Sequence, residues 1–315
     1  MYWATSKNEA LYLPLYLSQL IRMSKIKYID RNTGREKIES VPAEGIMKWL
    51  YGSPIGKVAL YVLLKRKLVS VLGGWFMNSI FSKKRIQVFI TDYNIEMTDY
   101  LQTDASKFKH FNDFFYRKIN PAKRPIGQGV VSPADGKMLA FQSIEESTSF
   151  FIKGSHFDLS RFLGTAELAQ KYRGGAMLII RLAPTDYHRY HFPAKGIASE
   201  TSMINGYYYS VSPIALRQSL EVFCENKRTI STLVTASYGD ILISEVGATM
   251  VGSILQSYDV NSSVEAGSEK GYFAFGGSTV VLLFEQGKVK LSDDLIQNTK
   301  NGLETQVLVG QTIGG

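Results

Sequence analysis

The 315-residue chain carries a formal net charge of +8, and 45% of its residues are hydrophobic while 20% are charged. Such a composition is typical of a folded protein with one large core or two modest ones, and it excludes a disordered chain. A single cysteine, Cys224, excludes an internal disulfide, and neither it nor the four histidines show the spacing of a metal site. The sequence therefore predicts no metal centre, and the lack of a GxGxxG or Walker-type motif leaves a nucleotide cofactor without support.

Residues 1–40 are predicted to form an N-terminal extension that ends in a short strand. An apolar patch within residues 10–17 is interrupted by Pro14, is too short to span a bilayer, and lacks the features of a secretion signal. Met23 is also a suitable start, so the sequence leaves open whether residues 1–22 belong to the native protein. Residues 28–34 then have the pattern of a strand and a turn.

Residues 41–117 have a helical pattern and carry the charge excess of the chain. Between Gly45 and Thr91 there is no acidic residue, yet there are eight basic ones, which include clusters at 65–67 and 83–85. Large aliphatic and aromatic residues lie between these cations, which is typical of a helical surface that docks on an anionic membrane. A further helical piece is predicted for residues 97–106, and aromatic residues just after it are expected to anchor the helices to the rest of the chain.

Two other interpretations of this basic segment remain open on the residues alone. The helices can form a hairpin that packs on its own core with a solvated basic edge, and that interpretation is as well supported as membrane docking. Nucleic acid is disfavoured, because the residues between the cations are large aliphatics and not polar side chains that read bases. A membrane span is not predicted, since the longest uncharged stretch falls short of the ~20 residues that a span needs.

Residues 118–315 are predicted to form a β-rich body, which follows a break at Asn120-Pro121. Short runs of β-branched and aromatic residues alternate with turn residues throughout this part. Short helices are expected at residues 156–171 and 212–219. The fold class is therefore predicted as α+β, with a helical N-terminal region packed on a β-rich catalytic body. The predicted strands are residues 130–131, 138–141, 150–153, 177–182, 229–235, 241–244 and 280–284.

Three short motifs in the β-rich part carry the side chains that can do chemistry. The first is a turn with Asp135 before a glycine, a pattern that structural turns also use. The second contains His188 and His191 between two prolines, which leave room for about one helical turn, on which residues three apart can face one cavity. The third places Ser278 after two glycines and before an apolar strand.

A carboxylate, an imidazole and a hydroxyl are together the groups that activate a serine as a nucleophile. Ser278 does not lie in the GxSxG elbow of a hydrolase, and Gly276 and Gly277 before it permit the strained backbone that attack on its own preceding carbonyl requires. The residues alone also allow a structural role for each motif, namely a turn aspartate, hydrogen-bonded histidines and a tight turn before a strand.

Taken in order, the motifs resemble those of phosphatidylserine decarboxylase proenzymes, and the resemblance runs from about residue 28 to residue 284. The two glycines before Ser278, together with a helical N-terminal region and no membrane span, are similar to the type II bacterial branch. The motifs that carry the resemblance are FNDFFYR at 111–117, RPI at 124–126, SPADGK at 132–137, KG at 153–154, YHRYHFP at 187–193, VGATMVG at 246–252 and GGST at 276–279.

The resemblance implies that the chain cleaves itself. Asp135 would orient His191, which would deprotonate Ser278, and Ser278 would then attack the carbonyl carbon of Gly277. The resulting ester would be eliminated and hydrolysed, leaving a β chain of residues 1–277 and an α chain of residues 278–315 that begins with a pyruvoyl group made from Ser278. Asp135, His191 and Ser278 would thus form the charge relay of self-cleavage, and no metal or diffusible cofactor is implied.

The resemblance also implies the reaction of the mature protein. The pyruvoyl group at position 278 would form a Schiff base with the amine of phosphatidylserine and accept the electrons released as CO2 leaves. His188 would then protonate the carbon that lost the carboxylate, which gives phosphatidylethanolamine. The expected partners are phosphatidylserine, an anionic membrane surface and the chain's own cleaved α chain, with a homodimer allowed and nucleic acid excluded. The expected location is peripheral, on the cytoplasmic side of the cell membrane.

Two alternatives differ from this interpretation in substrate or in class. A pyruvoyl enzyme that acts on a soluble amino acid would have no need of the cationic apolar segment, and activity on free serine would identify it. An inactive membrane-binding protein that keeps only the fold would remain an intact chain after expression. The segment favours the lipid enzyme, because a diacyl lipid leaves a bilayer only at a cost of ~0.8 kcal/mol for each exposed CH2 group.

Overall fold

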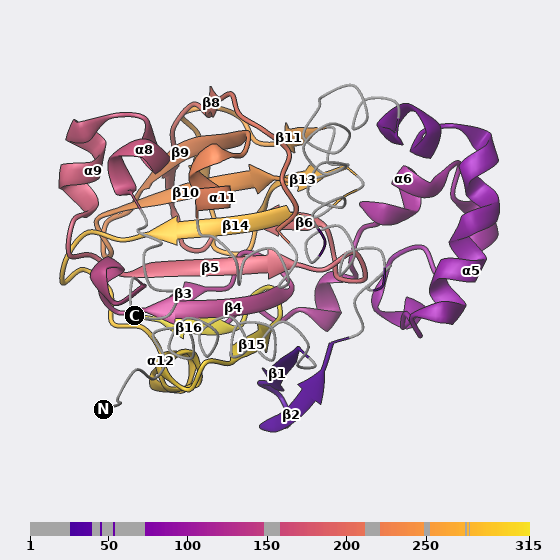
Figure 1. Ribbon diagram of the computed structural model, residues 1–315, viewed down its shortest axis with the longest axis horizontal. Helices are drawn as coiled ribbons and strands as arrows, with labels where there is room; N and C mark the ends of the chain where they lie inside the picture. The colour runs from indigo at the N-terminus through magenta and orange to yellow at the C-terminus, as the bar shows by residue number, and fades with distance from the viewer. Residues whose placement is uncertain are drawn as a thin grey trace, which may run out of the picture.

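The computed structural model describes residues 26–39, 45, 53, 73–147, 158–211, 221–248, 253–274, 276 and 278–315. The largest element in these residues is a sheet of 11 strands in the order β12-β7-β9-β10-β14-β5-β4-β15-β1-β2, with β8 paired to β9 (Figure 1). Neighbouring strands are antiparallel except β1 and β15, which are parallel. The strands are β1 (Lys27–Asp30), β2 (Arg35–Ile38), β4 (Gly136–Phe141), β5 (Met177–Leu182), β7 (Gly196–Ala198), β8 (Ser202–Ile204), β9 (Arg228–Val234), β10 (Asp240–Gly247), β12 (Ser263–Val264), β14 (Ser278–Leu283) and β15 (Glu304–Val307).

The centre of this sheet is covered on both faces, which explains why its strands read as continuous hydrophobic runs. Strands β4, β5 and β14 are buried at every residue. Val280 of β14 belongs to one hydrophobic cluster, whereas Val281 belongs to a second cluster. Because alternate residues of a strand point to opposite faces, Ser278 lies on the face of the first cluster and Thr279 lies on the face of the second.

Two smaller sheets and several short helices complete the β-rich body. One sheet has the order β11-β13-β6, and the other pairs β16 with β3. Helices α8 and α9 lie together at one end of the central sheet (Figure 1). These elements are β3 (Val130–Val131), β6 (Arg189–His191), β11 (Ile254–Gln256), β13 (Glu269–Phe273), β16 (Thr312–Gly314), η6 (Ile144–Glu146), α8 (Leu159–Leu163), α9 (Ala166–Tyr172), α11 (Glu221–Glu225) and α12 (Asp293–Lys300).

The described part of the helical region lies at the end of the sheet opposite α8 and α9 (Figure 1). Its elements are η2 (Ile80–Lys83), α5 (Lys84–Asp92), η3 (Met97–Asp99), η4 (Ala105–Lys107), α6 (Phe111–Phe115) and η5 (Pro121–Lys123). The region has a core of its own, which we call the helical core: Met77, Ile86, Phe108, Phe111, Phe114 and Phe115.

A second apolar cluster joins the helical region to the β-rich body. Tyr100 and Ile119 pack there against Tyr187 and Val309. Tyr187 directly precedes one of the predicted histidines, so the helical region is packed against the part of the body that carries the candidate site.

The structure confirms a mixed α and β fold with a large sheet and few helices, and it confirms most of the predicted strands. The predicted strand 177–182 is β5 to the residue, and helices α8 and α9 occupy residues 159–172 as expected. The continuous helical piece predicted for residues 97–106 is wrong. The side chains of Glu96 and Asp104 each cap a separate short 3-10 turn there, so the chain turns twice without forming a longer helix.

Several predictions concern residues outside the described ones. They are the extension 1–22, most of the helical stretch 41–72, the strand 150–153, the helix 212–219 and Gly277. Among the described residues, no helix combines the length and the apolar character needed to cross a membrane.

Candidate active site

The three predicted motifs meet at one edge of the central sheet, which we call the site edge. Ser278, the first residue of β14, lies opposite Leu182 at the end of β5 and opposite Gly247 at the end of β10. Lys137 of β4 pairs with the residue before Leu182, so the turn with Asp135 opens β4 at the same edge. Neighbouring strands lie about 4.8 Å apart, so pairing brings together residues that are far apart in the sequence. The ends of β5 and β10 point toward the side where α5 and α6 lie (Figure 1).

Ser278 is fully buried, and its Oγ has no hydrogen-bond partner among the described residues. Such a group is unusual, because a buried hydroxyl without a partner costs roughly 1–3 kcal/mol. The backbone before it is unusual as well, since Gly276 has a φ of 143°, which residues with a side chain rarely adopt. Strand pairing on both sides thus holds the serine in place while its hydroxyl stays available for reaction.

The carboxylate of Asp135 is held by hydrogen bonds from two residues. Arg124 donates to it from Nη2 at 2.7 Å and from Nε at 3.2 Å, and the main-chain N of Val309 donates at 2.7 Å. Burial lowers the pKa of Arg124, but hydrogen bonds to Asp135 and Asp99 outweigh this effect and raise it. The carboxylate is therefore anchored at the site edge by a guanidinium that stays charged.

His191 ends strand β6 and is tied by its main chain to the Asp135 turn. Its main-chain N donates to Pro133 O at 2.7 Å. Its Nδ1 lies 2.8 Å from Gly267 O, so Nδ1 carries the proton, and Tyr187 donates its hydroxyl hydrogen to Nε2 at 3.2 Å. Burial lowers the pKa of His191, while the hydrogen bond to Gly267 and nearby carboxylates, Asp135 included, oppose that shift. The imidazole is neutral at pH 7, and Nε2 is its basic atom.

His188 is fully buried and faces different partners. Its Nδ1 donates to Asp186 O at 2.9 Å, and its ring stacks on Phe115 of α6 with 3.8 Å between the ring centroids. Burial lowers the pKa of His188 to about 3, so the ring is neutral and Nε2 carries a lone pair. That Nε2 has no hydrogen-bond partner among the described residues. The main-chain O of His188 accepts from Phe273 N at 2.9 Å, at the end of the strand that leads toward Ser278.

The two histidines do not share a helical turn, so the condition under which they would face one cavity is not met. The chain is extended here, because residues 189–191 pair with β13 as strand β6. Side chains three apart in an extended chain point to opposite sides. The strand geometry therefore accounts for two separate histidine environments, one against Phe115 and one against Tyr187.

The predicted charge relay is assembled only in part. Asp135, His191 and Ser278 gather at the site edge, yet no direct hydrogen bond links any two of them among the described residues. The buried atoms without a partner in the described part of the chain include two of complementary chemistry, the hydroxyl of Ser278 and the basic Nε2 of His188. No group of three or more His, Cys, Asp and Glu residues in the described part of the chain is placed to hold a metal ion.

Sequence reasoning missed the residues that hold these groups in place. Arg124 and Lys137 lie inside the RPI and SPADGK motifs, but the pattern gives no sign that they pair with Asp135 and Asp186. Tyr187, which donates to His191, lies in the YHRYHFP motif, and nothing in that motif marks it as a hydrogen-bond donor to the histidine. Each of these contacts joins segments by tertiary packing or through a turn, so no local periodicity marks it.

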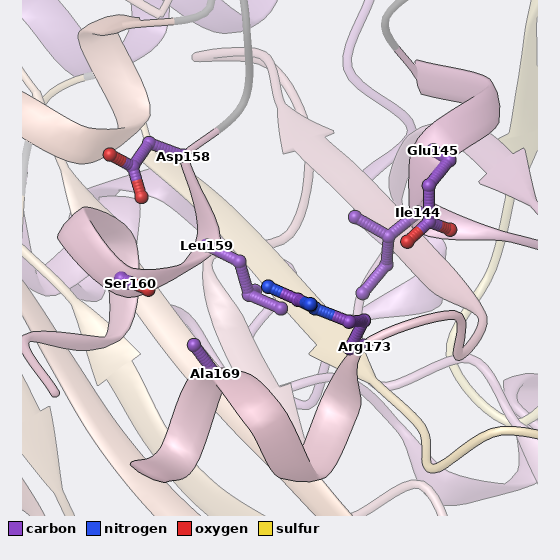
Figure 2. Close-up of a pocket in the computed structure, with 7 residues that line it drawn as sticks. All are labelled: Ile144, Glu145, Asp158, Leu159, Ser160, Ala169 and Arg173. Carbon is purple, nitrogen blue, oxygen red and sulfur yellow. The ribbon is translucent and has the colours of Figure 1, made fainter. Parts of the chain in front are cut away.

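A separate cavity of about 250 Å³ lies at the other end of the central sheet, beyond the end of β4 and the start of β5. Figure 2 shows Arg173 extending toward Leu159, with the carboxylates of Glu145 and Asp158 at its margins. None of the predicted site residues lines it, so it is not part of the site edge.

Comparison with known proteins identifies the family to which these motifs belong. The model of the family described as phosphatidylserine decarboxylase matches residues 111–315. A phosphatidylserine decarboxylase proenzyme from Fusobacterium nucleatum is 48% identical over 297 residues, which cover 93% of this chain and 99% of that protein. Proenzymes of the same name from Clostridium kluyveri and Desulfitobacterium hafniense are 46% and 42% identical, each over 92% of this chain and 98% of the relative.

Proposed function

We propose that this chain, which belongs to the phosphatidylserine decarboxylase family, is a self-cleaving proenzyme that converts phosphatidylserine into phosphatidylethanolamine and CO2. The observation that carries the proposal is the state of Ser278: a fully buried serine whose hydroxyl has no partner among the described residues, two residues after a glycine with positive φ and at the same sheet edge as Asp135 and two histidines. Release of CO2 from phosphatidylserine vesicles by the purified protein tests it. Turnover of free serine with none of the lipid would favour the soluble-substrate alternative.

The residues at the site edge fit a covalent pyruvoyl group made from Ser278. Strand pairing to Leu182 and Gly247 fixes the main chain of Ser278, and the group would inherit that position without a separate binding site. When present, the pyruvoyl group supplies a ketone that binds the substrate amine and accepts the electron pair left by CO2.

The arrangement of β14 supports the persistence of the cleaved protein as one unit. Cleavage between Gly277 and Ser278 would leave β14 between β5 and β10, and β15 between β4 and β1, with all four partner strands in the other chain. Val280 and Leu282 would stay inside a cluster made mostly of β-chain residues. The α chain of residues 278–315 would therefore remain bound by the sheet and the core rather than by a covalent link.

For self-cleavage, we assign the base to His191 Nε2. Its proton on Nδ1 is fixed by Gly267 O, which leaves Nε2 as the atom that can take a proton from the Ser278 hydroxyl. This transfer requires His191 to exchange its hydrogen bond with Tyr187 for one with Ser278. The anchored charge of Asp135 would stabilise the imidazolium that forms, because an opposite charge favours the protonated ring.

For decarboxylation, we assign the proton transfer to His188 Nε2. The neutral ring carries a lone pair on Nε2, so it must first take up a proton from the substrate or from solvent before it can act as a donor. The same atom can return the proton to the carbon that lost its carboxylate. Because burial lowers the pKa of His188, its protonated ring is a stronger acid than an ordinary imidazolium, which favours the return step.

The burial of His188 predicts a loss of stability in mild acid. Its pKa is about 3 in the folded protein against 6.5 for the ordinary group, so the unfolded chain binds the proton more tightly. The contribution of neutral, buried His188 to the free energy of unfolding is therefore fully present above pH 6.5. It is lost toward pH 3, by about 1.4 kcal/mol for each pH unit. We expect the free energy of unfolding in urea to fall about 2 kcal/mol less between pH 7 and pH 5 in a His188→Gln protein than with His188 present. Both chains should carry Ser278→Ala to remain uncleaved, and equal slopes would contradict the prediction.

We also propose that the outer surface of the helical region docks on the cytoplasmic face of the membrane. Three large apolar side chains on it, Trp75, Ile80 and Phe81, are 75%, 72% and 74% exposed. The exposed cations Lys84 and Arg85 follow them in the chain, while the helical core packs inward. An exposed apolar group with adjacent cations suits a lipid interface with anionic head groups. The described residues thus show both features that the sequence left open. The helices pack inward on their own core, and their outer surface stays exposed.

Replacement of Trp75, Ile80 and Phe81 by serine should weaken binding to anionic vesicles by roughly 50-fold, if each side chain contributes half of the ~1.5 kcal/mol of full burial. High salt should release the wild type only in part, because screening removes the charge attraction alone. Co-sedimentation at low and high salt measures both effects. A matched control replaces Ile197, Met203 and Val260, which are also exposed but lie on the β-rich body. Equal binding by both triple variants would show that this surface does not dock.

A further inference from the structure

One buried cation next to the candidate site has no counter-charge among the residues that the structure describes. Arg117, just after α6, is 2% exposed, and its guanidinium carbon lies 4.1 Å from the ring centroid of Tyr100 and 4.5 Å from that of Phe114. Among the described residues, no carboxylate lies within ion-pair distance of it. A buried charge is costly unless an opposite charge or a full set of hydrogen bonds compensates it.

The hydrogen bonds of Arg117 do not provide a full set. Nη1 donates to Phe114 O at 3.2 Å, and Nη2 donates to Tyr100 OH at 2.9 Å and to Thr185 O at 3.4 Å. Nε is buried and has no partner within the described part of the chain. The guanidinium is therefore held by two rings and three neutral acceptors, and two of its five N–H groups, including that of Nε, have no partner among the described residues.

The other buried arginines in the described residues do not share this condition. Arg124, Arg181 and Arg189 each pair with a carboxylate. Arg228 has no carboxylate partner, but its Nε, Nη1 and Nη2 all donate to main-chain carbonyls. Arg228 thus shows how this protein satisfies a guanidinium that serves structure alone, and Arg117 departs from that pattern.

Arg117 lies beside the proton-transferring histidine. Thr185 O, which accepts from Arg117, belongs to the turn whose Asp186 O accepts from His188. Phe115, two residues before Arg117, stacks on the His188 ring. After burial, the charge of Arg117 is among the effects that lower the pKa of His188, which again indicates that the two are neighbours.

We propose that Arg117 binds the phosphodiester of phosphatidylserine while the serine part of the substrate reacts beside His188. The proposal rests on the decarboxylase function proposed above. The phosphate is separated from the reacting amine only by the serine side chain, so a group next to His188 is suitably placed to reach it. A guanidinium matches phosphate by its planar set of donors. The substrate carboxylate is a poorer ligand here, because a cation that paired with it would stabilise the ground state and oppose its loss as CO2.

Two dispersed substrates separate this role from a structural one. The first is a short-chain phosphatidylserine, and the second is a serine O-alkyl ether of similar length that lacks phosphate. Arg117→Gln should lower kcat/KM for the phosphate substrate by about 10- to 100-fold and leave that for the ether nearly unchanged. Arg117→Lys keeps the charge but loses the planar set of donors. Its kcat/KM for the phosphate substrate should lie between those of the wild type and Arg117→Gln. The matched control Arg228→Gln should lower kcat/KM by the same factor for both substrates.

The kcat/KM values for the two substrates distinguish phosphate binding by Arg117 from a purely structural role. Equal losses on both substrates in the Arg117 variants would mean that Arg117 only ties the helical region to the body. Equal kcat/KM of the wild type for the two substrates would mean that phosphate is not recognised. If Arg117→Gln does not fold, the ratio of the two substrates in Arg117→Lys decides in the same way. A wild type that decarboxylates neither substrate would instead overturn the proposed function.

Discussion

A Ser278→Ala protein should remain a single chain after expression and should release no CO2 from phosphatidylserine. The change removes the only atom of residue 278 that can attack the carbonyl of Gly277, and with it the precursor of the pyruvoyl group. The wild type should instead give two chains, with the smaller one comprising residues 278–315 and beginning with a blocked N-terminus. A denaturing gel with intact mass measures both results.

The neighbouring residue provides a matched control. Thr279 is also fully buried, and its hydroxyl likewise has no partner within the described ranges, but it lies on the opposite face of β14. Thr279→Val should therefore cleave at the same bond. Cleavage between residues 277 and 278 in the Ser278→Ala protein would overturn the proposed chemistry, whereas an intact wild type would support the inactive-protein alternative.

His191→Ala and His188→Ala should fail at different steps. His191→Ala should accumulate as an uncleaved chain, because Nε2 of this ring is the base assigned to Ser278. His188→Ala should cleave but lose about 10²- to 10⁴-fold in the rate of CO2 release, which is the usual contribution of a positioned acid or base. The separate environments of the two rings, on Tyr187 and on Phe115, make this division physically reasonable.

His110 supplies the control for loss of an imidazole. Its Nδ1 accepts from Asp113 N and caps α6, so His110→Ala should cost only about 1 kcal/mol of stability and spare both steps. For all three variants, a denaturing gel measures the fraction of cleaved chain, and an assay of that cleaved fraction measures CO2 release. Two uncleaved proteins, or cleavage by His191→Ala together with an uncleaved His188→Ala, would show that the roles are assigned wrongly.

The sequence alone predicted most of the strands that the structure describes, and it identified the groups that we propose to react. The run Met177 to Leu182 is mostly aliphatic, and the run after Ser278 is mostly β-branched and aliphatic, which favours buried strands. The glycines before Ser278 predict a backbone conformation that residues with a side chain rarely adopt, and the positive φ of Gly276 agrees with this prediction. Ordered motifs likewise identified the family, because their residue types and spacing are written directly in the chain.

Only the tertiary structure decided how these groups are held. Ser278 pairs with both Leu182 and Gly247 because β5 and β10 are the neighbours of β14. The sequence does not indicate this choice, since the alternation of side chains along a strand is the same whichever strands become its neighbours. The same holds for the capture of Asp135 by Arg124, and for the uncompensated burial of Arg117 beside His188. The charge state of a side chain follows from burial and from partners distant in sequence. Composition and local spacing therefore name the chemistry, while packing determines which atoms are available to perform it.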